Sequence, residues 1–255
     1  MLGLFDSGLG GLTVLKAVRA LAPDEDIVYF ADQAHVPYGE RTDADLLHLL
    51  GENLAFLERF PIGGIVMACN TSCAIGGKYG WPITRTRALD LIDNCARAIA
   101  ATAHGRVAVI ATQATVRSGA YARKIALHAP TITVQEIAAP LLVPLVEGGL
   151  AASLQARAAV ADVVAHIAGP VDAVILGCSH YPLLAEHFRA LLPSSTAIVD
   201  PALAQAHATA ALCATRGNAT TRYFTNGDVR AFEANVRAWM DDPHATVAAA
   251  ESLAV

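Results

Sequence analysis

Short runs of apolar, often β-branched residues alternate with helix-like stretches along most of the 255-residue chain. Most of these runs are apolar at successive positions, which is typical of strands buried on both faces of a parallel sheet. The predicted strands cover residues 2–5, 27–31, 64–68, 107–111, 171–176, 196–199 and 222–225. The predicted helices cover residues 11–22, 43–59, 87–103, 115–128, 150–168, 183–192, 202–215 and 229–240, before a loose Ala-rich tail. This order predicts βαβ units and an α/β fold with mostly parallel sheets.

The second half of the chain repeats the pattern of the first. Residues 64–71 are an apolar run followed by a small residue, a cysteine and two polar residues, and residues 173–180 have the same pattern. Upstream of each, at residues 2–7 and 107–112, another apolar run ends in polar residues. We therefore predict two similar, pseudo-symmetric α/β lobes with a boundary near residues 90–100.

Polar residues follow the predicted strands at four places. These are residues 6–7, 69–71, 112–115 and 178–180. Open parallel sheets bind ligands at the carboxyl ends of their strands. If the two lobes face each other through these ends, the pattern predicts an interlobe cleft, with Cys69 on one side and Cys178 on the other.

Composition narrows the class of protein. With 54% hydrophobic and 16% charged residues, the chain has enough apolar side chains for a large core. A net charge of −5 argues against nucleic-acid binding, because it gives no basic surface for phosphates. No apolar stretch reaches the roughly 18 residues of a membrane span, and no signal peptide is recognisable, so we expect a cytoplasmic protein without a membrane partner. Five cysteines, an odd number, do not indicate a disulfide framework.

Two glycine-containing turns are candidates for ligand binding. The first, at residues 6–13, precedes a predicted helix, so its backbone N–H groups could bind an anion. It lacks the lysine and the glycine spacing of nucleotide-binding loops, which makes a small carboxylate the simpler ligand. The second, at residues 36–39, offers the hydroxyl of Tyr38 and the amide of Gly39, although an ordinary surface turn has the same pattern.

Cys69 and Cys178 differ from the other cysteines because each lies between a predicted strand and a helix. A helix N-terminus lowers the pKa of a thiol from about 8.5 toward neutrality. His180 follows Cys178 closely and could stabilise its thiolate as an imidazolium, so this pair alone is compatible with a hydrolase nucleophile. Two cysteines in equivalent positions suit inversion of a stereocentre better. That reaction needs one group to remove a proton from one face and another to deliver a proton to the opposite face.

Metal and cofactor chemistry have weaker support in the sequence. Neither a C-x-x-C nor an H-E-x-x-H pattern occurs. The three lysines, Lys16, Lys78 and Lys124, lie in helical or surface contexts, and none resembles the Schiff-base lysine of a pyridoxal enzyme. We therefore predict no metal and no cofactor.

Several motifs, in order along the chain, resemble those of glutamate racemases. They are FDSGLGGLTVLKAVRALAPDEDIVYFAD at 5–32, VPYGER at 36–41, ACNTS at 68–72, ATQATVRSGAYARK at 111–124, APLLVPLVEGG at 139–149, LGCSHYPLL at 176–184 and IVD at 198–200. The two cysteine motifs together are the specific part. The resemblance implies a cofactor-independent enzyme, usually a homodimer, that binds a small amino acid and converts L-glutamate to D-glutamate for peptidoglycan synthesis.

The resemblance also implies roles for individual residues. Its catalytic residues are Cys69, Cys178, Asp6, Glu147 and His180, of which the two cysteines exchange protons with the substrate. Its substrate contacts are Asp6, Ser7, Tyr38, Gly39, Asn70, Thr71, Thr112, Thr115, Ser179 and His180. It further implies that the C-terminal segment returns to the first lobe, which gives a division into residues 1–92 with 202–255, and residues 93–201.

Three places depart from the pattern of glutamate racemases. Ser179 stands where threonine is usual. The sequence of residues 76–87 differs from the usual segment after the first cysteine, and Asp93-Asn94 stands where Glu-Pro is usual. These changes bear on closure and dimer contacts more than on the chemistry. Three alternatives stay open. One is a racemase for aspartate or another amino acid, which needs only a changed side-chain pocket. The others are a cysteine hydrolase that uses Cys178 alone and a binding protein on an inactive scaffold.

Overall fold

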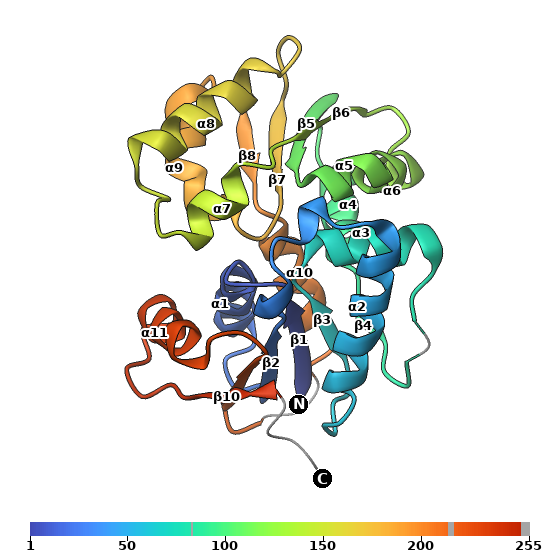
Figure 1. The fold of residues 1–255 in the computed structure, drawn as a ribbon. Coiled ribbons are helices and arrows are strands. Elements are labelled where there is room, and N and C mark those ends of the chain that lie inside the picture. The colour runs from blue at the N-terminus through green and yellow to red at the C-terminus, as the bar shows by residue number, and fades with distance from the viewer. Residues whose placement is uncertain (83, 214–216, 251–255) are drawn as a thin grey trace.

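The computed structural model describes residues 1–82, 84–213 and 217–250. Its strands form two sheets, one in each of two lobes (Figure 1). The first sheet has the order β10-β9-β2-β1-β3-β4, with β1 (Leu2–Asp6), β2 (Ile27–Ala31), β3 (Ile65–Met67), β4 (Ala88–Leu89), β9 (Thr221–Thr225) and β10 (Val247–Ala249). The second has the order β6-β5-β7-β8, with β5 (Arg106–Ala111), β6 (Thr133–Ala138), β7 (Ala173–Gly177) and β8 (Ala197–Val199).

The strand order confirms the predicted repeat. The segment β2-β1-β3-β4 of the first sheet has the same order as β6-β5-β7-β8 of the second, and every strand pair among the described residues is parallel. β3, which precedes Cys69, and β7, which precedes Cys178, therefore occupy equivalent places beside the central strands β1 and β5. The predicted α/β fold with two pseudo-symmetric lobes is confirmed.

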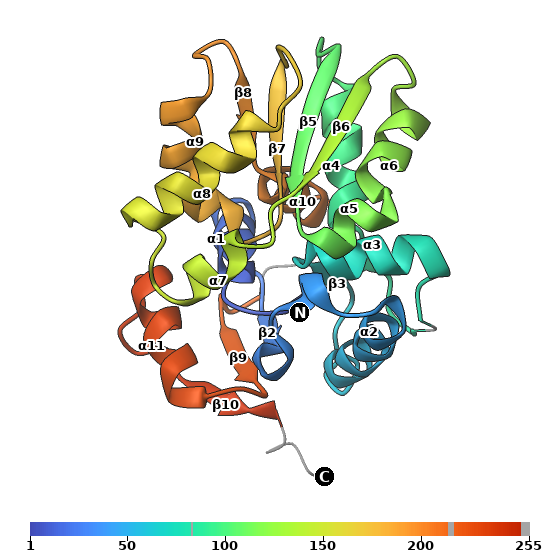
Figure 2. The same cartoon turned by 45° about the horizontal axis from the view of Figure 1, so that its top comes forward.

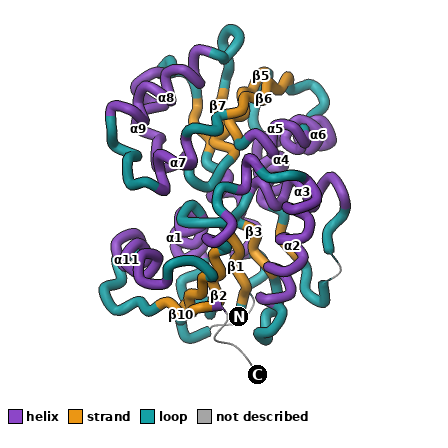
Figure 3. Tube along the Cα trace, in the orientation of Figure 1, coloured by secondary structure: helices purple, strands orange, loops and turns teal. Residues whose placement is uncertain are grey.

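Helices enclose the strands at the centre of each lobe (Figure 3). The first lobe contains α1 (Gly11–Leu21), α2 (Asp43–Leu57), α3 (Asn70–Tyr79), α10 (Pro201–Ala210) and α11 (Val229–Trp239). The second sheet is accompanied by α4 (Leu91–Ala100), α5 (Gln113–Ser118), α6 (Ala120–His128), α7 (Leu142–Glu147), α8 (Leu154–Ala165) and α9 (Ala185–Leu191), which Figure 2 shows on its two sides. No helix in the described part of the chain is long and apolar enough to span a membrane.

Successive side chains of a strand point to opposite faces of the sheet. In the part of the chain that the structure describes, the buried apolar side chains form three clusters. Leu4 of β1 packs in a cluster with α1, α10 and α11, whereas its neighbour Phe5 packs in another with α2 and α3. The second of these clusters continues through α4 and α6 to Val109 of the second sheet. The outer face of the second sheet packs against α7, α8 and α9. One apolar cluster thus extends through both lobes.

Two helices cross between the lobes. α4 follows β4 of the first sheet and packs against α6, while α10 follows β8 of the second sheet and packs against α1. The predicted division of the chain, at 92/93 and 201/202, falls near the first residues of these two helices.

The structure differs from the sequence predictions in several elements, among them α7, which was not predicted. The helix predicted over 87–103 begins only at Leu91, because residues 88–89 form β4 and Asp90 accepts the N–H groups of Ile92 and Asp93 as an N-cap. The helix predicted over 115–128 is divided into α5 and α6 by Gly119, whose φ of 63° is left-handed. The edge strand β6 was not predicted, and part of the Ala-rich tail forms β10.

Candidate active site

The carboxyl ends of the two sheets meet at a small cavity of about 20 Å³, room for about one water molecule. Its lining consists of Ser7, Val36, Tyr38, Gly39, Cys69, Asn70, Thr71, Thr112, Val143, Cys178, Ser179 and His180. The predicted interlobe cleft is therefore present, with both cysteines on its wall. An amino acid is larger than this volume, so its entry requires the walls to separate.

The glycine-rich turn after β1 binds two carboxylates of the protein itself. The N–H groups of Gly8 and Gly11 each donate to Oδ2 of Asp6 at 2.9 Å, and the N–H of Leu9 donates to Oε1 of Glu147 at 3.1 Å. Burial raises the pKa of Asp6, although the positive charge of His180 and the N–H groups of Gly8 and Gly11 lower it in part. We expected this turn to bind the carboxylate of a ligand. For these three N–H groups the expectation is wrong, because they already donate to the side chains of Asp6 and Glu147.

Close packing joins this turn to the second cysteine segment. A Cβ on Gly10 would lie 2.7 Å from both Nδ1 of His180 and the carbonyl carbon of Ser179, so the approach requires glycine. The hydroxyl of Ser179 donates to Oδ1 of Asp6 at 3.1 Å. This contact needs a hydroxyl and not a methyl group, so Ser179 in place of threonine preserves it.

Cys69 is the N-cap of α3, and its thiol is buried. Its Sγ accepts a hydrogen bond from the N–H of Ser72 at 3.5 Å and donates one to Oγ of Ser7 at 3.6 Å. Burial raises the pKa of the Cys69 thiol to about 12, and the negative charge of Asp6 adds to the increase. Hydrogen bonds from Ser72, in the first turn of α3, lower this pKa in part, but burial outweighs them, so the predicted net lowering is wrong. In the closed protein, Cys69 is a neutral thiol at pH 7.

Cys178 begins a chain of three polar groups. Its Sγ lies 3.7 Å from Nδ1 of His180, and Nε2 of His180 lies 2.5 Å from Oε1 of Glu147. Burial lowers the pKa of His180, but its interactions with Cys178 and Glu147 outweigh burial and raise this pKa well above 6.5. Burial raises the pKa of Glu147, but the hydrogen bond and charge of His180 outweigh it, and the net change is a lowering. An imidazolium–carboxylate pair thus places a positive charge beside Cys178.

The segment after Cys178 differs from the prediction. It forms a turn and the short 3₁₀ helix η3 (Tyr181–Leu184) before α9, so no α-helix begins at this cysteine. The imidazolium of His180, rather than a helix N-terminus, supplies the positive charge there.

We predict that Glu147→Gln destabilises the protein more at pH 5.5 than at pH 9. The pKa of His180 is raised on folding, so the stabilisation from its charge is complete below pH 6.5 and is lost as pH rises through the folded-state pKa. The pKa of Glu147 is lowered, so its contribution is complete above pH 4.5 and is lost as pH falls through the folded-state pKa. The pair therefore stabilises most between pH 4.5 and 6.5.

Urea unfolding at both pH values measures this effect. Glu147→Gln is expected to reduce the free energy of unfolding by about 2 kcal/mol at pH 5.5 and by less at pH 9. Glu186→Gln is the matched control, because Glu186 pairs with Arg189 on an exposed surface, and its loss should be small at both pH values. Equal losses at both pH values for Glu147→Gln would contradict the ion pair.

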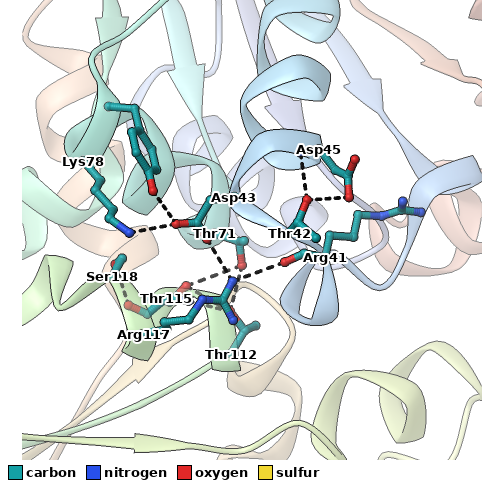
Figure 4. Close-up of polar contacts among 11 residues, drawn as sticks. Arg41, Thr42, Asp43, Asp45, Thr71, Lys78, Thr112, Thr115, Arg117 and Ser118 are labelled. Atoms are coloured by element: carbon teal, nitrogen blue, oxygen red, sulfur yellow. Dashed lines mark hydrogen bonds and ion pairs between the residues drawn. The ribbon is translucent and has the colours of Figure 1, made fainter.

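Three threonine hydroxyls join the lobes beside the cavity (Figure 4). Oγ1 of Thr71 on α3 lies 2.8 Å from Oγ1 of Thr112 and 3.4 Å from Oγ1 of Thr115, and the last two are 2.9 Å apart. All three side chains are buried. Since a hydroxyl both donates and accepts, this triangle can turn an O–H donor toward a ligand.

An ion-pair cluster crosses the same boundary nearer the surface, as Figure 4 also shows. Nη2 of Arg117 on α5 lies 2.9 Å from Oδ1 of Asp43 at the start of α2, and it donates to the carbonyl of Arg41 at 3.2 Å. Lys78 and Tyr79 hydrogen-bond the other oxygen of Asp43, at 2.7 and 2.8 Å. Hydrogen bonds, that of Lys78 foremost, lower the pKa of Asp43 strongly. Through Arg117, the cluster links the segment before α2 to the second lobe.

Tyr38 and Gly39 lie in a loop that contains two 3₁₀ turns, η1 (Gln33–His35) and η2 (Tyr38–Glu40). The Tyr38 hydroxyl donates to Oδ2 of the buried Asp32 and accepts from Nδ2 of Asn53 at 2.8 Å. Nδ2 of Asn226, in the C-terminal part of the chain, donates to Oδ1 of Asp32 at 2.5 Å. The hydroxyl predicted to contact a ligand is thus engaged within the first lobe, and this network holds the loop in place.

The structure brings the predicted site residues together in two layers. All of them line the cavity except Asp6, Thr115 and Glu147, which lie behind it and hydrogen-bond to lining residues. Val36 and Val143 also line the cavity and were not predicted. Nothing in the sequence distinguishes these two valines from those of the core.

The sequence profile of the Asp/Glu/hydantoin racemase family matches residues 13–209. The chain belongs to this family. Among curated relatives, the glutamate racemase of Gloeobacter violaceus is 40% identical over 246 residues, which cover 94% of this chain and 92% of the relative. The predicted resemblance to glutamate racemases is confirmed, and so is the prediction that this family member is an enzyme of the racemase class.

Solved structures agree with the family assignment. Glutamate racemase isoform RacE1 from Bacillus anthracis superposes with a TM-score of 0.89 at 28% identity and covers 98% of this chain and 96% of its own. The glutamate racemase of Francisella tularensis, solved in complex with D-glutamate, has a TM-score of 0.86 at 27% identity, with 97% and 96% covered.

Proposed function

We propose that this family member racemises glutamate without a cofactor, with Cys69 and Cys178 exchanging protons at opposite faces of the substrate's α-carbon. One observation carries the proposal: the two cysteines follow equivalent strands of two lobes and line one small cavity. Relatives named glutamate racemase that match nearly the whole chain support the choice of substrate.

The reaction consists of two proton transfers at one carbon. A thiolate on one face takes the α-proton, and the electron pair of the C–H bond stays on the α-carbon. The thiol on the opposite face then donates its proton to that electron pair and is left as a thiolate. The substrate's proton ends on the first sulfur, the product's proton comes from the second, and the reverse reaction exchanges their roles.

Electrostatic support has to replace the electron sink that a cofactor would offer. The Nδ2 of buried Asn70 has no hydrogen-bond partner among the described residues, which costs about 1–3 kcal/mol. A substrate carboxylate that accepts from this amide removes the cost. Hydroxyls of Ser7 and Thr71 also line the cavity, and its closure excludes water, which strengthens these interactions.

Two charged groups tune the thiols in this proposal. Asp6 helps to keep Cys69 protonated, because its negative charge contributes to the raised pKa of that thiol. His180, held by Glu147, places a positive charge beside Cys178. A base on one face and an acid on the other are thereby available together.

The proposal has four further parts, and the resemblance to glutamate racemases implies three of them: the dimer, the use of the product and the division into lobes. The protein acts as a homodimer in the cytoplasm, and its D-glutamate enters peptidoglycan synthesis. The lobes are residues 1–92 with 202–255, and residues 93–201.

A panel of single L-amino acids tests the proposed substrate. The purified chain is incubated with L-glutamate, L-aspartate or L-alanine, and the D-isomer is measured by chiral chromatography. We expect D-glutamate to form about 100-fold faster than D-aspartate. Formation of D-aspartate without D-glutamate would overturn the substrate, and no D-isomer from any amino acid would favour a binding protein.

A further inference from the structure

Tyr121 on α6 lies between the two cysteine segments and is fully buried. Its hydroxyl donates to Oδ1 of Asn70 at 2.6 Å, from the second lobe to the first. Its ring packs on Gly177, where an added Cβ would lie 3.0 Å from Cε2 of the tyrosine. Asn70 follows Cys69, and Gly177 precedes Cys178. One side chain therefore contacts the neighbour of each cysteine.

We infer that Tyr121 is a positioning residue that fixes the amide of Asn70 with its N–H₂ group toward the substrate carboxylate. This inference rests on the proposed function. A side-chain amide has an acceptor on one side and a donor on the other, and the two orientations have nearly the same shape. With Oδ1 held by the Tyr121 hydroxyl, Nδ2 is the group left without a partner, on a residue of the cavity lining.

The orientation matters because a substrate carboxylate only accepts hydrogen bonds. A turned amide would present Oδ1 to it and would repel it. Burial raises the pKa of Tyr121 well above 10, so its hydroxyl keeps the proton it donates throughout the pH range of activity. The orienting bond thus persists while the cysteines exchange protons with the substrate.

Tyr121→Phe tests the inference, because it keeps the ring on Gly177 and removes only the hydroxyl. We expect KM for L- and D-glutamate to rise about 10-fold, the value of one hydrogen bond to a charged group, with kcat changed less than about 3-fold. Tyr223→Phe is the matched control, since Tyr223 is a buried tyrosine of the first sheet outside the cavity. Its kinetic constants should equal those of the parent chain.

The same substitution in an Asn70→Ala background separates positioning from a general structural effect. There Tyr121→Phe should change kcat/KM less than about 2-fold, because the amide that it orients is gone. Equal losses in both backgrounds, or no loss in either, would overturn the role of Tyr121 while the parent chain still racemises glutamate. A parent chain without glutamate racemisation would overturn the proposed function and this inference with it.

Discussion

Serine in place of Cys69 or Cys178 is expected to lower racemisation of glutamate by about 10³-fold or more. A hydroxyl fits either position but is a far weaker acid than a thiol. Each turnover needs a base on one face and an acid on the other, so loss of either group stops the reaction. Polarimetry from pure L- and pure D-glutamate measures both directions. Because enantiomers have equal free energies in water, kcat/KM has to fall by the same factor in each direction.

Cys213→Ser is the control for replacing a thiol with a hydroxyl. Cys213 lies just after α10 and does not border the cavity. Its variant should racemise glutamate within about 2-fold of the parent rate. A near-parental rate for Cys69→Ser or for Cys178→Ser would show that one thiol is dispensable and would contradict the two-thiol account.

Asp6→Asn is expected to lower kcat by about 10²-fold with a smaller change in KM. The asparagine oxygen can still accept the N–H groups of Gly8 and Gly11, so the turn keeps its shape while the negative charge is lost. That charge contributes to the raised pKa of Cys69. Removing it therefore lowers the pKa of this thiol and weakens its thiolate as a base. Rates of both directions as a function of pH report the change.

Asp200→Asn is the matched control for Asp6→Asn. Asp200 is also a mostly buried carboxylate whose pKa is raised by burial, and it accepts the N–H of Ala202 as the N-cap of α10. It does not border the cavity. Its variant should keep kcat within about 3-fold of the parent chain. If both variants lost kcat equally, the effect of Asp6 would reflect a buried charge in general and not its place beside Cys69.

The central strands could be predicted from sequence because their burial on both faces makes them continuously apolar. β1 and β7 are buried at every position. β6 was missed because it is an edge strand that carries Gln135 and Glu136, and edge strands keep one side near water. β4 was missed because two residues are too few to show a strand's pattern of apolar positions. Both failures lie at sheet edges, where burial is incomplete.

The site could be predicted as a set of residues but not as an electrostatic arrangement. Strand ends and the repeat bring Cys69 and Cys178 to one cavity, as expected. The pKa of Cys69 was predicted in the wrong direction, because a local helix argument omits the burial that closure of the two lobes produces. The contact of Tyr121 with Asn70 joins residues far apart in the chain, and no local pattern indicates it.

Isotope incorporation in D₂O tests the central claim most directly. The chain is mixed with protiated L-glutamate in D₂O, and both enantiomers are isolated before about a tenth of the substrate has reacted. With two thiols on opposite faces, the D-glutamate formed should carry deuterium at the α-carbon while the remaining L-glutamate stays protiated. Deuterium in the remaining L-glutamate at the same rate, or protium retained in the product, would contradict the account.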